Sequence, residues 1–372
     1  MNILLIMITE TAIKKKQKIA YNSLYRILEN THIMNEYVNN DISQFGRSFP
    51  FSSYLKGSKF MITGATGLIG STLVRCILAL NNGASITIPV RNRAKTAAMY
   101  GADTPRLNIV ECDLMEYSAT LDDEFDYIIH CASPTAGKYM NEHPVETYEL
   151  AVETTRALLQ YARKHTIKGM VYVSSLEYYG QNFDDQIITE DFQGYVDATS
   201  ARSSYPMGKR AAEYLCASYA LEYGIHAKVA RLTQTFGAGV AADDNRVFAQ
   251  FARSVMAGTD IILHTTGESA KPYCYTTDCA SAILTILLKG MNGEAYNVAN
   301  QDSYISIREM AEFLRDNFNP QIKVTVEEHP EMGYAPVTKL HLSSEKLMAL
   351  GWKPQYDLKE MFNRLINSFE NE

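Results

Sequence analysis

From residue 58 onward, short runs of apolar and often β-branched residues alternate with longer segments whose apolar residues recur every three to four positions. Runs of the first kind predict buried strands, and segments of the second kind predict amphipathic helices. Because the short runs are continuously apolar and helices separate them, we predict an α/β fold with a doubly wound parallel sheet covered on both faces. The strands are expected at 58–63, 84–90, 107–112, 127–132, 170–175 and 226–232.

The pattern also predicts how the chain divides. Two long helical segments, 145–165 and 204–224, lie between strands, as in a dinucleotide-binding Rossmann domain. After about residue 235 polar loops, short strands and helices near 245–257 and 356–370 replace this rhythm. We interpret that part as a smaller C-terminal substrate-binding cap. The expected domains are an N-terminal extension at 1–57, the Rossmann domain at 58–235 and the cap at 236–372, which is partly interleaved with the Rossmann domain.

The N-terminal extension is polar, rich in asparagine and weakly patterned, so we expect it to pack loosely on the domain. Its first residues include an apolar run, but the lysines follow this run instead of preceding it, and no small-residue cleavage site is present. A secretory signal has the opposite order. No run of 18 apolar residues occurs, so a membrane-spanning helix is not expected.

Composition narrows the function classes. Hydrophobic residues make up 46% and charged residues 21% of the 372 residues, as in soluble globular proteins. The net charge of −7 and the absence of a basic stripe argue against a nucleic-acid partner. The six cysteines show neither a C-x-x-C motif nor zinc-type pairing with histidine. We therefore expect reduced thiols, a cytoplasmic location and no metal site.

The stretch "FMITGATGLIGSTLV" at 60–74 places Gly64, Gly67 and Gly70 between a predicted strand and a predicted helix. A dinucleotide-binding turn needs this order, because glycines let the backbone approach the pyrophosphate. The N-terminus of the helix then presents free N–H groups to the phosphates. The alternative is a tight strand-to-helix corner that binds nothing.

The end of the second strand bears on which dinucleotide is bound. An acidic residue about 20 positions after the glycines is typical of NAD, yet Arg91 stands 21 residues after Gly70. An arginine can pair with the 2′-phosphate, so NADP is favoured over NAD. Alternatively, Arg91 and Arg93 are solvated surface charges. Asp113, after the third strand, is placed to contact the adenine or to cap a helix.

Tyr205 and Lys209 lie four residues apart on a predicted helix, so their side chains project from one face. Ser174 and Ser175 end the fifth strand, at the sheet edge where such folds bind ligands. The charge of Lys209 is expected to lower the pKa of the Tyr205 phenol, which can then accept a hydroxyl proton while hydride leaves carbon. The alternative is a tyrosine and a lysine on an ordinary amphipathic helix.

Taken together, "TGATGLIG", "DL", "HCAS", "SSLEYYG" and "YPMGK" resemble the extended short-chain dehydrogenase/reductase family over about residues 58–365. Within it the chain is similar to nucleotide-sugar epimerases, dehydratases and decarboxylases. The segments 273–278 and 292–300 are similar to the cap-bearing half. The resemblance implies a catalytic triad of Ser175, Tyr205 and Lys209. The full expected set of cofactor-binding residues is Thr63, Gly64, Thr66, Gly67, Leu68, Ile69, Gly70, Arg91, Asn92, Asp113, Leu114, Cys131, Ala132, Ser133, Tyr205 and Lys209.

Glu177 bears on the type of reaction. The resemblance implies that a glutamate three residues before Gly180 is similar to the base of dehydratases and is also present in decarboxylases. After oxidation at C4 of a sugar, such a carboxylate can remove the C5 proton. A dehydratase is also expected to have an acid beside it, but position 176 is Leu. The alternative is a solvated loop glutamate.

Other departures from the family pattern concern the substrate. Gln234 stands where the family usually has asparagine, and Lys271 replaces a diphosphate-binding arginine. Thr338 occupies a second position where a decarboxylase is expected to keep arginine, which weakens that alternative. Arg246 is a candidate phosphate partner or a surface arginine. The expected substrate-binding residues are Ser133, Gln234, Arg246 and Lys271.

We therefore predict a nucleotide-sugar epimerase or dehydratase that uses NAD(P). The alternatives are a reductase or dehydrogenase of a keto-sugar or polyol derivative, a decarboxylase, and a dinucleotide-binding protein without catalysis. The family pairs its two long helices into a homodimer interface, so a homodimer is expected here. The apolar residues that permit such pairing, or that face the sheet instead, are Leu150, Leu158, Leu159, Leu215 and Tyr219.

Overall fold

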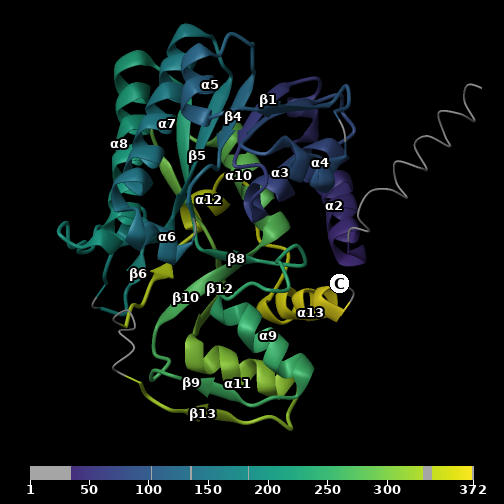
Figure 1. Ribbon diagram of the computed structural model, residues 1–372, viewed down its shortest axis with the longest axis vertical. Coiled ribbons are helices and arrows are strands. Elements are labelled where there is room, and N and C mark those ends of the chain that lie inside the picture. The colour runs from purple at the N-terminus through teal and green to yellow at the C-terminus, as the bar shows by residue number, and fades with distance from the viewer. Residues whose placement is uncertain (1–34, 102, 135, 183, 330–336, 371–372) are drawn as a thin grey trace, which may run out of the picture.

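A computed structural model describes residues 35–101, 103–134, 136–182, 184–329 and 337–370 (Figure 1). Its centre is a seven-stranded sheet in the order β11-β7-β5-β4-β1-β2-β3, in which every neighbouring pair is parallel. This confirms the predicted doubly wound sheet. The strands are β1 Lys59–Thr63, β2 Ser85–Val90, β3 Leu107–Glu111, β4 Tyr127–His130, β5 Gly169–Ser175, β7 Ala227–Leu232 and β11 Ala295–Val298.

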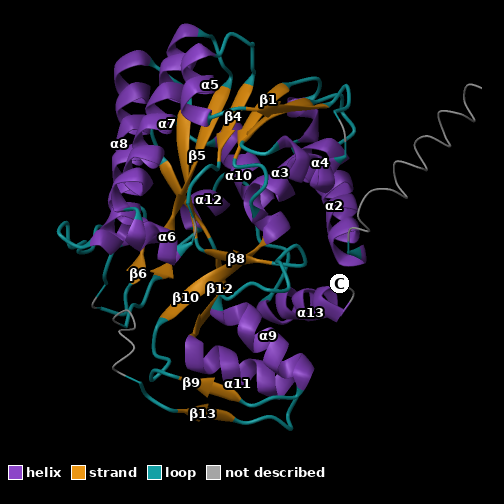
Figure 2. Ribbon diagram, viewed as in Figure 1, coloured by secondary structure: helices purple, strands orange, loops and turns teal. Residues whose placement is uncertain are grey.

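Helices cover both faces of this sheet, as Figure 2 shows. Along β5, Val171 and Val173 join the core beneath α3 (Leu68–Ala79) and α10 (Thr276–Lys289). Met170 and Tyr172 join the core beneath α7 (Pro144–Lys164) and α8 (Ser204–Tyr223). The alternation follows from strand geometry, because successive side chains point to opposite faces. The remaining Rossmann elements are α4 Arg93–Tyr100, α5 Leu114–Thr120 and α6 Gly137–Glu142.

The C-terminal cap has its own apolar core, built around the buried rings of Phe236, Phe248 and Phe362. Because α10 and β11 return to the central sheet, the cap is interleaved with the Rossmann domain. The cap strands are β8 Gln234–Phe236, β9 Ile261–Leu263, β10 Ala270–Tyr275, β12 Asn300–Ser306 and β13 Val324–Val326, and its helices are α9 Val247–Ala257, α11 Ile307–Phe318 and α13 Leu358–Glu370. Two short strands, β6 Ile187–Ile188 and β14 His341–Leu342, pair in parallel, and α12 Glu345–Met348 follows them in the chain.

The described part of the N-terminal extension is not loosely packed. Residues Glu36–Ser48 form α2, and the rings of Phe45 and Phe49 are buried in the core beneath α3 and α10. A Cβ on Gly46 would lie 2.5 Å from the Ala79 carbonyl oxygen, so the two helices approach closely. Although this segment is rich in asparagine, its helix is amphipathic, and the apolar face of the helix is aromatic. Residues 1–34 lie outside the described part of the chain.

Of the two orientations left open for the apolar residues of α7 and α8, four residues take the one toward the sheet. Leu158 and Leu159 are fully buried against the sheet, and Leu215 and Tyr219 pack against the same core. Leu150 lines the cleft described below. The large apolar side chains that α7 and α8 do expose are Val145, Tyr148, Tyr214, Leu221 and Tyr223.

Candidate active site

The glycine turn joins β1 to α3 at the carboxyl edge of the sheet. Gly64 has a φ of 67°, and a Cβ there would lie 2.8 Å from the Ala132 backbone nitrogen. A Cβ on Gly70 would lie 2.3 Å from the Gly64 carbonyl oxygen. These two positions therefore require glycine for the turn itself. Gly67 differs, because a Cβ there would meet only the Gly64 carbonyl oxygen at 3.4 Å and would otherwise face the cleft.

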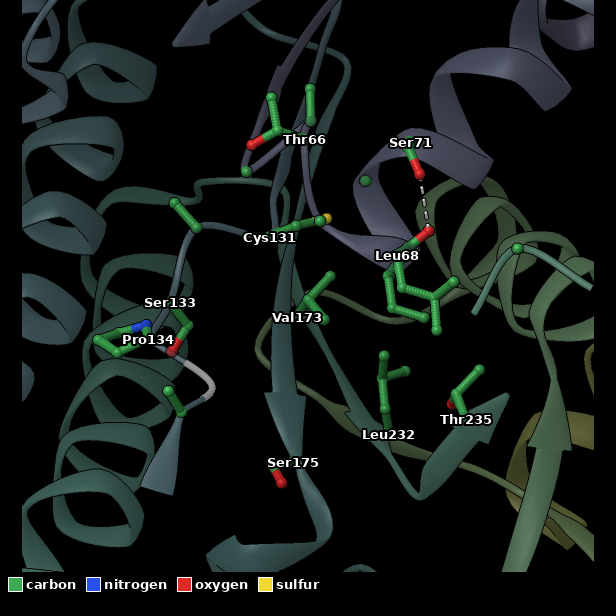
Figure 3. Close-up of a pocket in the computed structure, with 18 of the residues that line it drawn as sticks. Thr66, Leu68, Ser71, Cys131, Ser133, Pro134, Val173, Ser175, Leu232 and Thr235 are labelled. Atoms are coloured by element: carbon green, nitrogen blue, oxygen red, sulfur yellow. Dashed lines mark hydrogen bonds between the residues drawn. The ribbon is translucent and has the colours of Figure 1, made fainter. Parts of the chain in front are cut away.

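One cleft of about 2050 Å³ runs along this edge, from the glycine turn to the cap. Pockets for a single drug-sized ligand measure roughly 300–1,000 Å³, so this cleft has room for a dinucleotide and a second ligand together. Figure 3 shows Thr66 at the top of the view, Leu68 on the right, Ser133 and Pro134 on the left, and Ser175 at the bottom. Every predicted site residue lines the cleft except Thr63 and Asn92.

Thr63 and Asn92 instead make hydrogen bonds within the elements that surround the cleft. Thr63 is fully buried and its hydroxyl accepts a hydrogen bond from the Ala132 N–H at 3.1 Å. The Thr63 hydroxyl therefore makes its hydrogen bonds to other protein groups inside the fold. Asn92 is the N-cap of α4, and its side-chain oxygen accepts from the Lys95 N–H at 2.8 Å. Both predictions of direct cofactor contact by these side chains are therefore corrected.

Thr63 belongs to a buried hydrogen-bond chain that sequence reasoning missed. Its hydroxyl lies 2.7 Å from Nδ1 of His130, whose Nε2 lies 3.0 Å from the Thr154 hydroxyl. Thr154 donates onward to the carbonyl of Leu150, so its oxygen must accept from Nε2–H of His130. Nδ1 is then the acceptor for Thr63. Burial lowers the pKa of His130 to about 3, and nearby Lys209 lowers it further, so the ring stays neutral.

Tyr205 and Lys209 lie on the first turns of α8, beside the end of β5. The Lys209 ammonium donates to the Val173 carbonyl oxygen at 2.8 Å and lies 5.4 Å from the centre of the Tyr205 ring. Ser175 ends β5, and its hydroxyl accepts from the Glu177 N–H at 3.2 Å. The structure thus brings the three predicted catalytic residues together in the cleft.

The electrostatics of these groups differ from the sequence-based expectation. Burial lowers the pKa of Lys209 to about 8, although Glu213 acts against this shift. The pKa of Tyr205 is not lowered but raised to about 12, because burial and the charge of Glu177 outweigh the neighbouring Ser175 hydroxyl. The ligand-free site therefore holds a protonated phenol, and further positive charge is needed to ionise it.

A buried ion pair lies behind the site and was also missed from the sequence. Glu213 follows Lys209 by one helical turn, and its carboxylate accepts from the Arg231 guanidinium at 2.8 and 2.9 Å. Ser174 donates to the same carboxylate. Arg231 also donates to the Tyr179 hydroxyl at 3.0 Å. Because both charges are buried, each depends on the other.

At the cap end of the cleft, several polar groups line it. The Ser133 hydroxyl is buried beside the Tyr205 phenol, whose pKa it lowers, and makes no hydrogen bond of standard geometry with any described residue. The Glu177 carboxylate and the half-buried Lys271 ammonium have no hydrogen bond or ion pair within the described residues. Gln234 also lines this end. Arg246 does too, but its guanidinium is held by the Asp244 carboxylate at 2.6–3.0 Å.

At the opposite end, the exposed Arg91 lines the cleft. Arg93 is occupied elsewhere, because it donates to the Ile109 carbonyl and to Asp103. Asp113 lines the cleft and also caps α5, accepting from the Met115 N–H at 2.8 Å and the Glu116 N–H at 3.3 Å. Its cap role is thus observed, while contact with an adenine stays a prediction.

Residues 60–299 match the NAD dependent epimerase/dehydratase family. The chain belongs to this family. The residues present fit a dinucleotide of the kind that the family uses, because the open face of Gly67 and the length of the cleft leave room for one and the buried Ser133 hydroxyl lines it.

Individual members of the family that resemble the chain differ in reaction. UDP-glucuronic acid decarboxylase 6 of Arabidopsis thaliana is 28% identical over 325 residues, covering 84% of this chain and 90% of that protein. UDP-glucose 4-epimerase of Thermotoga maritima shares the fold, with a TM-score of 0.72 and 19% identity over 84% of this chain and 98% of that one. So does dTDP-glucose 4,6-dehydratase of Streptomyces venezuelae with NAD bound, with a TM-score of 0.69 and 21% identity, covering 84% and 97%.

Other predicted properties concern thiols, metals and membranes. All six cysteines are free thiols. Among the described residues, no group of three or more His, Cys, Asp or Glu side chains is arranged to hold a metal ion. The described helices include none that is long and apolar enough to cross a membrane.

Proposed function

We propose that this protein is an NAD(P)-dependent nucleotide-sugar epimerase or dehydratase in which Tyr205 is the acid/base. The observation that carries the proposal is the convergence of Tyr205, Ser175 and the buried Ser133 hydroxyl in one cleft, with Lys209 behind the phenol. A dinucleotide bound in the cleft would supply the chemistry of accepting a hydride from the sugar and giving it back to the oxidised sugar.

The chain's own residues account for the proton transfers. Ser175 and Ser133 offer hydroxyls that can bind and orient a sugar oxygen beside the phenol. Tyr205 takes the proton of that hydroxyl and later gives it back. Lys209 favours the phenolate as it forms, since its ammonium is held by the Val173 carbonyl near the ring.

Glu177 decides which reaction follows the oxidation. Its carboxylate faces the cleft and is free to take a proton from the carbon beside the new carbonyl group. Leu176 beside it cannot act as an acid, which favours epimerisation over loss of water. The likeness to UDP-glucuronic acid decarboxylases supports decarboxylation as the second candidate, although Thr338 stands where that reaction is expected to keep an arginine.

The cofactor preference, the assembly and the location are also proposals. Arg91 at the cleft supports NADP, and with it the alternative of a net reductase acting on a keto-sugar or polyol.

A homodimer through α7 and α8 would bury the exposed Tyr148, Tyr214 and Leu221. The six free thiols support a reducing, cytoplasmic location.

A panel of UDP-, dTDP-, GDP- and CDP-sugars tests the proposal, with products analysed by mass and stereochemistry. No mass change indicates epimerisation, loss of water dehydration and loss of carbon dioxide decarboxylation. Stoichiometric consumption of NADPH without recycling contradicts the leading proposal in favour of a reductase. Glu177→Gln should abolish dehydration but barely change a 4-epimerase, and Glu190→Gln, whose carboxylate bonds the Asn297 N–H away from the cleft, is the matched control.

A further inference from the structure

Helix α2 lies beside α3 of the Rossmann domain and α13 of the cap (Figure 1). It ends at Ser48, ahead of residues 60–299 that match the family. It is thus an element that the family match does not account for. Its contacts show how it connects the parts of the cofactor cleft.

Toward the Rossmann domain, α2 is fixed by apolar packing. Phe45 and Phe49 are buried in the core that also contains residues of α3 and α10. Their rings stack at 5.2 Å, and Gly46 allows the helix to approach the Ala79 carbonyl. The C-terminal end of α2 is therefore fixed to α3, the helix that follows the glycine turn.

Toward the cap, α2 is fixed by polar contacts. The almost fully buried Asp41 carboxylate accepts from Arg364 of α13 and from the Tyr275 hydroxyl at the end of β10. The Asn35 side-chain amide donates to the Ser368 carbonyl of α13. The same helix thus contacts both the Rossmann domain and the cap. Separating the Rossmann domain from the cap would break this ion pair and these hydrogen bonds.

The first turn of α2 reaches the cleft itself. Asn35 and Val38 line it together with Gly67 and Leu68 of the glycine turn and with residues of the cap loop 238–246. Val38 is half-buried there and has no polar group of its own. A dinucleotide held at the glycine turn would therefore have α2 as one of its walls.

We propose that α2 is a clasp for the dinucleotide: it forms a wall of the cofactor site and holds the cap against the glycine turn, so that bound cofactor leaves slowly. This inference rests on the dinucleotide site of the proposed function. A reaction that returns its hydride needs the same cofactor molecule through the whole cycle, and slow release meets that need.

The first test places a charge on the part of α2 that lines the cleft. Val38→Glu brings a carboxylate toward the cofactor phosphates and should weaken NAD⁺ or NADP⁺ binding, measured by calorimetry, by about tenfold or more. Asn40→Glu adds the same charge at an exposed position that does not line the cleft and should leave the affinity unchanged. Equal affinity in both variants overturns the clasp. If the wild-type protein binds neither dinucleotide, the proposed function fails instead.

The second test weakens the link to the cap. Asp41→Asn removes the charge that Arg364 pairs with, and bound dinucleotide should dissociate at least about fivefold faster in a displacement experiment. Arg364→Lys keeps the charge and should give a smaller change. The exposed pair Arg315–Asp316 provides the control Asp316→Asn. Adding NAD⁺ to the wild-type protein should also slow amide hydrogen exchange in 36–48. Unchanged release rates, or no protection of α2, overturn the proposal.

Discussion

The ammonium of Lys209 lies 5.4 Å from the centre of the Tyr205 ring while it donates to the Val173 carbonyl oxygen at 2.8 Å. The bond to β5 fixes the lysine, so its charge stays behind the phenol whether or not substrate is bound. The nearby Tyr172 ring, 4.7 Å from the same nitrogen, gives a second favourable contact. The catalytic pair is thus held by the sheet as well as by α8.

Replacing Tyr205 by Phe removes the proposed acid/base and keeps the ring that packs near Lys209. Turnover should fall by about 100-fold or more, because the proton transfer loses its carrier. Steady-state kinetics on the substrate found by the sugar panel measure the effect. Tyr214→Phe, on the same helix but exposed, is the matched control. Turnover within about twofold of the wild type would exclude Tyr205 from the chemistry.

The charge of Lys209 predicts a pH dependence. Because its pKa is lowered to about 8, the lysine loses its proton as the pH rises through 8, and kcat should fall on that alkaline side. Glu213 raises this pKa, so Glu213→Gln should move the alkaline limb to lower pH by roughly one unit. Its role is that of a positioning residue that acts through Lys209.

The pH profile separates this electrostatic effect from a folding defect, which would lower kcat without moving the limb. Glu222→Gln, at the exposed end of α8, should leave the limb in place. A Glu213→Gln profile that superimposes on the wild type after scaling would contradict the assigned role.

His130 predicts a pH dependence of stability. Its pKa is lowered to about 3, whereas the unfolded chain binds a proton near the ordinary value of about 6.5. Between these values the unfolded state binds more protons, so the free energy of unfolding should fall as the pH falls from 6.5 to 3. His130→Gln, which can still accept from Thr63, should reduce that slope by about one proton.

The same position tests the hydrogen-bond chain. His130→Phe leaves Thr63 without its acceptor and should lower the free energy of unfolding by about 1–3 kcal/mol at pH 7, measured by denaturant titration. His165→Phe is a control, since that ring stacks on Tyr161 at the end of α7, away from the cleft. A similar loss in both variants would mean that ring packing, and not the chain from Thr63 to Thr154, supports the fold.

Features that the sequence could reveal are those carried by contiguous patterns. The glycine turn and the Tyr205–Lys209 spacing each lie within one strand–helix or one helix segment, so local geometry predicts their orientation. Glu213 and Arg231 come from a helix and a strand 18 residues apart, and only the folded sheet brings them together. Likewise, the sequence could not show that Asp244 holds Arg246, or that Asp41 reaches Arg364 across 323 residues.

Arg91 offers the sharpest test of cofactor choice. It is exposed and lines the cleft, whereas Arg93 is engaged by Asp103 and the Ile109 carbonyl. If Arg91 pairs with a 2′-phosphate, Arg91→Ala should lower the affinity for NADP⁺ by about tenfold or more and change the affinity for NAD⁺ by less than about twofold. Calorimetric titrations with both dinucleotides measure the difference. Lys95→Ala removes a neighbouring exposed charge on α4 that does not line the cleft, so it reports the effect of general electrostatics alone. Equal losses for the two dinucleotides would place Arg91 at a part of the cofactor that both share and would remove the support for NADP.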